Sequence, residues 1–345
     1  MLAQFLPTRL PQHARYGAGA AASRRGESPR TARHTRSRAG HGRDSHSRRC
    51  CGVCHTDLHT VEGDLELPKL PVVPGHQIVG TVETLGEGVR AFHEGQRVGV
   101  PWLYSACGNC GYCLQNSENL CDFARFTGYH ADGGYAEAMV VSESFAYSIP
   151  HQFSDTNAAP LLCAGIVGYR SLKLSGVRDG ELLGLYGFGA SAHIVLQLAR
   201  YKGCEVYVFT RSEAHRQLAK KLGAAWVGEA KDDPQHQLDA AIIFAPAGAL
   251  LLDALRVLRK GGTVVLAGIT MTPIPQMDYS LLYHERIVRS VANSTRDDAR
   301  ELLELAAEVP VQTQVQVFEL EQANAALQAL KHSRIEGAGV LRVSN

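Results

Sequence analysis

The chain has 345 residues, enough for about two domains at roughly 150 residues each, and 45% of its residues are hydrophobic, which can fill a sizeable core. The net charge of +1 argues against an ordinary nucleic-acid-binding protein, because phosphate contacts need an excess of basic residues. No apolar run approaches the roughly 18 residues of a membrane-spanning helix, so the sequence also excludes a membrane-spanning protein.

The first 49 residues differ from the rest of the chain. They contain 11 Arg, one Glu and one Asp, which gives a net charge of +9, whereas the remaining residues have a net charge of −8. The segment contains no Val and no Ile. Because so little apolar surface cannot offset the entropy of ordering, we interpret 1–49 as a disordered arm. Three alternatives remain: a transit-like peptide, an arm for an acidic partner, and a frame-shifted version of a normal N-terminus. The abrupt start of the ordered pattern at Cys50 favours the last.

Between residues 50 and 152 the pattern is mostly that of β-structure. Residues 72–100 alternate apolar and turn residues, which predicts short strands joined by Gly turns, and 134–150 predicts further strands. The intervening stretch, 101–130, is loop-like and rich in cysteine.

From residue 153 to 290 strands and helices alternate. We predict, in chain order, a strand at 183–189, a helix at 192–203, a strand at 204–210, a helix at 213–223, a strand at 240–245, a helix at 249–262 and a strand at 263–269. The strands are apolar throughout, as in a parallel sheet covered on both faces. Beyond residue 290 the pattern predicts amphipathic helices at 295–308 and 321–333 and a closing strand at 339–344.

Four cysteines with short, regular spacing lie in the loop-like stretch: Cys107, Cys110, Cys113 and Cys121. Four thiolates in one loop suit a tetrahedral structural zinc. Disulfides and an iron–sulfur cluster are the alternatives. Disulfides would need strained bridges and an oxidising compartment, and we find no secretory signal peptide. A nucleic-acid zinc ribbon is disfavoured, because Glu118 is the sole charged residue between the first and last cysteine.

Cysteine and histidine recur in three other segments, CGVCHTDLH at 51–59, GHQIVG at 75–80 and LLCAG at 161–165. Two thiolates and one imidazole bind zinc with the fourth position open, as a catalytic zinc requires. Any one of these residues alone would more often be an ordinary core residue, so this hypothesis depends on all three segments together.

A glycine-rich turn follows an apolar strand and opens a helix, in the order Gly187, Phe188, Gly189, Ala190, Ser191, Ala192. This G-x-G-x-x-A context predicts a dinucleotide-binding loop in which the pyrophosphate sits at the helix N-terminus. The next strand ends at Thr210 and Arg211, where a site selective for NAD usually has an acidic residue for the ribose hydroxyl. Because a guanidinium binds a phosphate well, we favour NADP over NAD. An ordinary β–α turn and a solvated Arg211 are the alternatives.

Together these motifs resemble those of the zinc-dependent alcohol dehydrogenases of the medium-chain dehydrogenase/reductase superfamily, over residues 50–345. The resemblance implies an α/β fold with a GroES-like β catalytic domain and a Rossmann domain with a doubly wound parallel sheet. The expected divisions are the atypical segment 1–49, a catalytic domain with two zinc sites at 50–152, a coenzyme domain at 153–290, and a return to the catalytic domain at 291–345.

The resemblance also implies the roles of individual residues. Cys54, His76 and Cys163 would bind a catalytic zinc, and the four loop cysteines a structural zinc. Thr56 and His59 would relay the alcohol proton to solvent, and Asp57 would orient His76. A packed polar loop, and an Asp57 that merely caps a helix, are the alternatives for these three. Further members of the expected site are His55 near the pyrophosphate, Val167 and Gly268 at the coenzyme, and Trp102 in the substrate pocket.

Several residues depart from the family pattern. Gln77 stands where a Glu often follows the zinc-binding histidine, Val167 replaces a common Thr, and Ala338 replaces an Arg that contacts the pyrophosphate in many members. The largest departure is 1–49, where the family has hydrophobic strands. An unpaired sheet edge and an incomplete core would follow from their loss, so we expect lowered stability or lost activity.

We therefore expect a cytoplasmic alcohol dehydrogenase with two zinc ions per chain and NAD or NADP, acting on a small alcohol or aldehyde. The resemblance implies a homodimer or homotetramer, with no nucleic-acid or membrane partner. Two other hypotheses stay open: a catalytically impaired or dead binder of zinc and nucleotide, and a zinc-free quinone or enone reductase on the same fold, against which Cys54, His76 and Cys163 argue.

Overall fold

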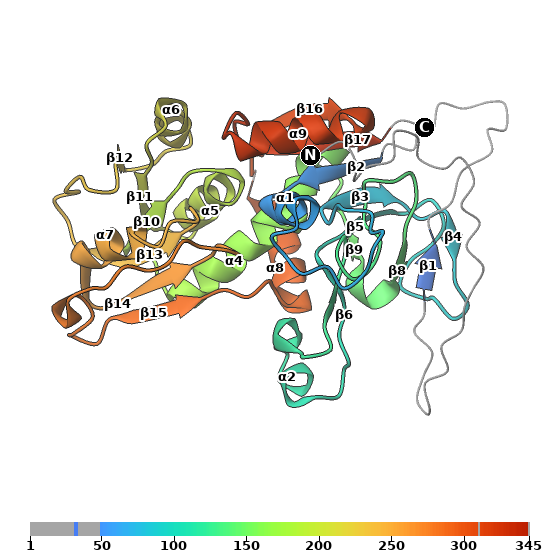
Figure 1. Ribbon diagram of the computed structural model, residues 1–345, viewed down its shortest axis with the longest axis horizontal. Coiled ribbons are helices and arrows are strands. Elements are labelled where there is room, and N and C mark those ends of the chain that lie inside the picture. The colour runs from blue at the N-terminus through green and yellow to red at the C-terminus, as the bar shows by residue number, and fades with distance from the viewer. Residues whose placement is uncertain (1–30, 34–48, 310, 344–345) are drawn as a thin grey trace.

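The computed structural model describes residues 31–33, 49–309 and 311–343 (Figure 1). A six-stranded sheet in which every neighbouring pair is parallel forms one half of the molecule. Its strands in spatial order are β12 (Trp226–Gly228), β11 (Glu205–Phe209), β10 (Leu182–Tyr186), β13 (Leu238–Ile243), β14 (Leu258–Leu266) and β15 (Ile287–Ser290). The strand order reverses direction between β10 and β13, which in doubly wound sheets is where a dinucleotide binds.

Helices cover this sheet and connect its strands. They are α4 (Ala164–Ser175), α5 (Ala190–Tyr201), α6 (Glu213–Lys221) and α7 (Leu250–Arg256). The predicted helix at 249–262 is wrong in its second half, because α7 ends at Arg256 and β14 begins at Leu258. Leu258 pairs with Leu238 of β13, and Gly261, which has φ 71°, and Gly262 both disfavour a helix here.

A second six-stranded sheet lies in the other half of the molecule (Figure 1). In spatial order its strands are β16 (Val315–Glu319), β17 (Ala338–Val343), β2 (Arg49–Val53), β3 (Ile78–Thr81), β5 (Arg97–Val100) and β9 (Tyr147–Ser148). Only β16 and β17 run parallel, and the other neighbours are antiparallel. The chain therefore returns at its C-terminal end to the sheet that holds β2, after passing through the parallel sheet. This confirms the predicted α/β class, a mostly antiparallel β domain beside a Rossmann domain.

Two small sheets complete the β domain. β6 (Leu103–Ser105) pairs with β7 (Arg125–Phe126), and β1 (Thr31–Arg33) lies between β4 (Thr84–Leu85) and β8 (Val140–Ser142). The expectation that 1–49 contributes no strand is therefore wrong for β1 and for the first residue of β2. Backbone pairing requires no apolar side chains, which is why composition did not predict β1. The rest of that expectation concerns residues outside the described part of the chain.

The remaining helices are α1 (His55–Glu62), α2 (Gly111–Leu114), α3 (Asp155–Ala158), α8 (Arg296–Glu308) and α9 (Ala323–Lys331). Short 3-10 helices occur at Glu118–Leu120, Glu143–Phe145, Ala159–Leu162, Tyr279–Leu281 and Leu320–Gln322. Nowhere in the described part of the chain is a helix both long and apolar enough to cross a membrane.

Helices α4 and α8 lie between the two halves (Figure 1). One buried apolar cluster includes Cys50 and Val79 from the antiparallel sheet together with Leu185 and Ile242 from the parallel sheet. Because the core continues across the junction, the two sheets hold a defined relation. The N-terminal end of α4 follows Cys163 directly and so places this cysteine at the junction.

Candidate active site

Cys54, His76 and Cys163 come from three separate segments and converge. Their ligand atoms all lie within 4.8 Å of one another. Cys54 precedes the first turn of α1, and Cys163 precedes α4. Each helix start thus fixes one sulfur, and the segment leading into β3 supplies the imidazole.

The buried Asp57 orients the histidine of this cluster. Its Oδ1 lies 2.8 Å from His76 Nδ1 and 3.0 Å from the donating backbone N–H of Gly75. Since a carboxylate only accepts hydrogen bonds, the proton resides on Nδ1 and the lone pair of the neutral ring on Nε2. His76 Nε2 is buried and has no partner in the described structure. An unpartnered nitrogen beside two sulfurs is the arrangement that a zinc ion requires.

The electrostatics of the cluster favour one anionic sulfur, that of Cys54. The hydrogen bond from Cys163 and the proximity of His76 hold the pKa of Cys54 well below its usual value despite burial. The same contact with Cys54 raises the pKa of Cys163. Burial by itself would lower the pKa of His76, but Asp57 and Cys54 outweigh it and raise the pKa to about 10. A cation placed here would replace the shared protons, because metal ligands bind deprotonated.

The four loop cysteines form a second cluster around α2, which contains Cys113. Their sulfurs also lie within 4.8 Å of one another, and Cys107 Sγ is 3.5 Å from Cys121 Sγ and 3.8 Å from Cys113 Sγ. Hydrogen bonds from the backbone N–H groups of Asn109 and Cys110 help to lower the pKa of Cys107 to about 6. The spacing therefore gathers four sulfurs around one point, and this donor set suits a structural zinc.

The glycine-rich turn lies between β10 and α5. Gly187 has φ 86°, and a Cβ there would lie 3.0 Å from the backbone nitrogen of Ala245, so the turn requires glycine. A Cβ on Gly189 would instead project into open space, which leaves room for a ligand at the start of α5. Ala192, in the first turn of α5, is buried in the core. Phe188 is buried in the core, so only its backbone faces the turn.

Thr210 and Arg211 follow β11 directly. Thr210 is buried, and its carbonyl accepts a hydrogen bond from Arg216 Nη1 at 3.0 Å. Arg216 is also held by Glu213 and Glu229. Arg211 is exposed, and no ion pair involves it in the described part of the chain. This leaves Arg211 as the cation available at the end of β11.

Thr56 and His59 occupy neighbouring positions on one face of α1, one turn apart. The Thr56 hydroxyl is buried, 3.8 Å from Cys54 Sγ. His59 Nδ1 lies 2.7 Å from Asp64 Oδ2, and its Nε2 lies 3.2 Å from Thr270 Oγ1 of the parallel-sheet domain. His55 is exposed at the start of α1, with its ring 6.5 Å from that of His59.

The structure also brings Trp102 to the cluster. Its ring centroid lies 6.1 Å from that of His76, and it stacks on Phe126 at 4.4 Å. Val167 lies in the first turn of α4, where its N–H donates to Cys163 O at 2.8 Å. Gly268 lies just beyond β14, and a Cβ there would lie 2.8 Å from the carbonyl oxygen of Thr270. This close approach needs glycine.

Sequence reasoning missed four residues around the site: Phe126, Tyr135, Asp64 and Thr270. The Tyr135 hydroxyl lies 3.4 Å from Asp57 Oδ2, and the others are described above. Asp64 lies ten residues after Cys54 and just beyond α1. Of the four residues, it is the one that its place in the sequence could have associated with the site. The remaining three are distant in sequence and become neighbours only in the tertiary structure.

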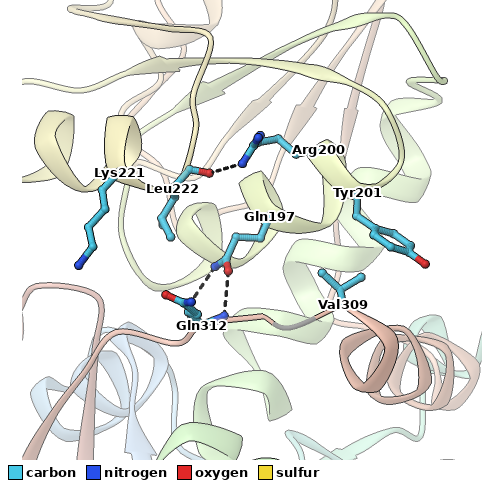
Figure 2. A pocket seen from close by; sticks show the side chains of 7 residues that line it. All are labelled: Gln197, Arg200, Tyr201, Lys221, Leu222, Val309 and Gln312. Atoms are coloured by element: carbon cyan, nitrogen blue, oxygen red, sulfur yellow. Dashed lines mark hydrogen bonds between the residues drawn. The ribbon is translucent and has the colours of Figure 1, made fainter.

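A surface pocket of about 390 Å³ lies between α5, α6 and the segment after α8 (Figure 2). Gln197 and Gln312 exchange two hydrogen bonds across it, and Arg200 donates to the carbonyl of Leu222 at 2.8 Å. None of its lining residues belongs to either cysteine cluster or to the glycine-rich turn. These polar groups bind one another, so the pocket is separate from the chemistry described above.

Comparisons with known proteins agree with this arrangement. Residues 47–151 match the family model of the alcohol dehydrogenase GroES-like domain, and 192–308 match that of zinc-binding dehydrogenase. These two domains define the class, a zinc-binding dehydrogenase with a GroES-like and a Rossmann domain. A probable alcohol dehydrogenase AdhA of Mycobacterium tuberculosis is 48% identical over 299 residues, covering 85% of this chain and 86% of the relative. An alcohol dehydrogenase of Geobacillus stearothermophilus is 40% identical, covering 86% and 90% respectively.

Solved structures give the same result. A cinnamyl alcohol dehydrogenase of Sorghum bicolor has a TM-score of 0.80 at 29% identity, covering 86% of this chain and 88% of that one. CAD from Helicobacter pylori, in complex with NADP(H), has a TM-score of 0.79 at 25% identity, covering 91% and 90%. The chain belongs to the zinc-type alcohol dehydrogenases of the medium-chain dehydrogenase/reductase superfamily.

Proposed function

We propose that this alcohol dehydrogenase is zinc-dependent and transfers hydride reversibly between a primary or secondary alcohol and NAD(P), giving an aldehyde or ketone. The convergence of Cys54, His76 and Cys163 within 4.8 Å carries the proposal, because such a cluster has no evident use in a zinc-free reductase. These three residues would hold a catalytic zinc, and Cys107, Cys110, Cys113 and Cys121 a structural zinc. When bound, the catalytic zinc polarises the alcohol oxygen.

The protein's own side chains orient the His76 ring and carry the alcohol proton away. Asp57 fixes the ring of His76, and Thr56 accepts the alcohol proton and passes it towards His59. Trp102 lies beside the cluster and bounds the substrate. The alcohol loses one proton through this relay and one hydride to the coenzyme, which balances the oxidation.

The coenzyme would bind at the turn between β10 and α5. The turn from Gly187 to Ala192, with Phe188, Ala190 and Ser191 contributing backbone, would receive the pyrophosphate at the N-terminus of α5. By the family resemblance, His55, Val167 and Gly268 would also contact the coenzyme. We favour NADP, since Thr210 supplies no carboxylate and Arg211 is a free cation.

Replacing Arg211 by Gln should raise KM for NADP about tenfold or more, the cost of roughly one charge-assisted hydrogen bond, and leave KM for NAD unchanged.

The central experiment combines metal analysis with a steady-state screen of alcohols and aldehydes against both coenzymes. We expect two zinc ions per chain in the wild type, and one zinc and no turnover in Cys163→Ser. Cys204→Ser is the matched control, since Cys204 is a buried cysteine outside both clusters. Turnover that survives loss of the zinc would favour the reductase, and zinc and coenzyme binding without turnover would favour a dead relative.

The domain and assembly proposals rest on the same structure. We place the catalytic domain at 50–152 and 291–345 and the coenzyme domain at 153–290. We further propose a homodimer or homotetramer. Supporting this, β15 is an edge strand of the parallel sheet, and the exposed Tyr279, Tyr283 and Ile287 lie on or just before it.

A further inference from the structure

His59 joins the two domains through its two ring nitrogens. Nδ1 lies 2.7 Å from Asp64 Oδ2, five residues along the chain, and Nε2 lies 3.2 Å from Thr270 Oγ1, which belongs to the parallel-sheet domain. The His59 side chain is 18% exposed, whereas that of Asp64 is 51% exposed. The imidazole is therefore mostly covered, whereas the carboxylate at its Nδ1 is half exposed.

Thr270 is held in place rather than carried on a loose loop. Two residues further on, the N–H of Thr272 donates to Pro246 O at 3.2 Å, and its hydroxyl accepts from the N–H of Gly248 at 2.9 Å. On the other side, Gly268 permits a tight turn that a Cβ would block. The segment after β14 is thus fixed to the segment after β13. The Thr270 hydroxyl therefore contacts His59 of the other domain from a defined position.

These two partners determine the tautomer of the neutral imidazole. A carboxylate accepts but does not donate, so the nitrogen beside Asp64 carries the proton. Nε2 is then an acceptor, and the Thr270 hydroxyl, which both donates and accepts, donates to it. A second neighbouring ring, that of His55, is 6.5 Å away and makes no such contact.

We propose that Asp64 and Thr270 are positioning residues of the proton relay, holding His59 in the Nδ1–H tautomer so that Nε2 is the basic nitrogen. This rests on the proposed function, in which His59 receives the alcohol proton. When Nε2 takes up that proton, the imidazolium donates through Nδ1 to Asp64 and through Nε2 to Thr270, whose hydroxyl rotates to accept. Both charge states are satisfied without movement of the ring. When the imidazolium then loses one proton to solvent, Asp64 keeps the remaining proton on Nδ1, which restores the starting tautomer.

The first test needs no activity. In zinc-loaded protein labelled with ¹⁵N at histidine, His59 is assigned by comparison with His59→Gln. We expect a protonated Nδ1 and a non-protonated Nε2 in neutral wild-type protein. In Asp64→Leu, a near-isosteric apolar replacement, the proton should shift to Nε2 or be shared. A wild-type His59 with its proton on Nε2 would overturn the proposal.

The second test is kinetic. For zinc-loaded enzyme we expect kcat for alcohol oxidation to fall about tenfold in Asp64→Leu, within the range that a positioned base contributes, with KM for the alcohol unchanged. Asp64→Asn keeps an acceptor oxygen and should lose less. Thr270→Val should also lower kcat, whereas Thr270→Ser, which keeps the hydroxyl, should keep kcat near the wild-type value. Because Asp64 acts through His59, Asp64→Leu should have no further effect in the His59→Gln background.

Asp132→Asn is the matched control. Asp132 is a carboxylate of similar exposure, 54%, that pairs with Lys69 in the same domain, and its removal should leave kcat unchanged. Effects of Asp64→Leu and His59→Gln that multiply would overturn the positioning role. If the zinc-loaded wild type shows no turnover at all, the proposed function fails. The ¹⁵N measurement of the His59 tautomer then tests this inference separately.

Discussion

Asp57 is a buried carboxylate with four donors around it. Oδ2 accepts from the Cys54 N–H at 2.9 Å and lies 3.4 Å from the Tyr135 hydroxyl, while Oδ1 accepts from Gly75 N–H and His76. Four donors leave no place for a further N–H. The same side chain caps α1 and contacts His76 Nδ1, so the geometry allows the capping and metal-site interpretations of Asp57 to hold together.

Replacing Asp57 by Asn should weaken zinc binding at the cluster of Cys54, His76 and Cys163 by about 10- to 100-fold. The amide N–H₂ would face donors, so we also expect the free energy of unfolding to fall by about 1–3 kcal/mol. Chelator competition on purified protein measures the affinity, with the four-cysteine site as the internal control. Equal loss of both zinc ions, or of neither, would contradict this role.

At the scale of elements, α5 carries a buried histidine that the sequence did not mark. His193 Nδ1 lies 3.2 Å from Gly189 O, and Nε2 accepts from the backbone N–H of Gln314 at 3.3 Å. Both nitrogens are satisfied only in the neutral ring, because a proton on Nε2 would face another N–H. Burial accordingly lowers the pKa of His193 to about 4. The histidine thereby joins the coenzyme-binding helix to the segment before β16.

This histidine should make stability depend on pH. The unfolded chain binds the His193 proton below about pH 6.5 and the folded protein only below about 4, so unfolding is favoured progressively between these values. We expect a loss of about 3 kcal/mol from pH 7 to pH 4 attributable to this residue, at 1.36 kcal/mol per pKa unit. Denaturant unfolding at several pH values measures it. His193→Gln should be less stable at pH 7 but flatter with pH, and an unchanged slope would refute the assignment.

At the scale of the whole molecule, the N-terminal segment is the unusual feature. In the described part, β1 supplies three residues to a sheet with β4 and β8, and the 49-residue segment around it has no Val or Ile. We expect this chain to be less stable than a relative with apolar strands there. Replacing residues 1–48 by the corresponding segment of the Mycobacterium tuberculosis relative should raise Tm by about 5 °C, equivalent to roughly 2 kcal/mol.

Intact mass of the natural protein would test the frame-shift interpretation of the same segment. The zinc content of the wild type and of the chimera serves as the control that both have folded sites. If the wild type already melts at the temperature of its relatives with two zinc ions per chain, the stability prediction fails.

The assembly prediction concerns the far edge of the parallel sheet. β15 has a neighbour on one side only among the described strands, and Tyr279 and Ile287 are 70% and 51% exposed. Such an edge pairs readily with its copy about a two-fold axis. Ile287→Lys should shift the protein to smaller species in light scattering after size exclusion. A wild type that is monomeric at micromolar concentration would exclude this interface.

The sequence by itself determined those features that arise within one short segment. The spacing of Cys107 to Cys121 gathers four sulfurs because a loop of this length keeps them near one another, and Gly187 and Gly189 define a turn through their own backbone. The alternation of apolar strands and helices likewise predicted the parallel sheet. It misplaced the end of α7, where pairing of Leu258 with Leu238 overrides local helix preference.

The tertiary structure decided everything that depends on distant segments meeting. Cys54, His76 and Cys163 come together because sheet register and the continuous core fix α1, β3 and α4 relative to one another. Thr270 reaches His59 across 211 residues, and no pattern in either segment encodes that contact. A short loop constrains its own side chains by chain length alone, whereas partners in different domains are set by the packing of the whole core.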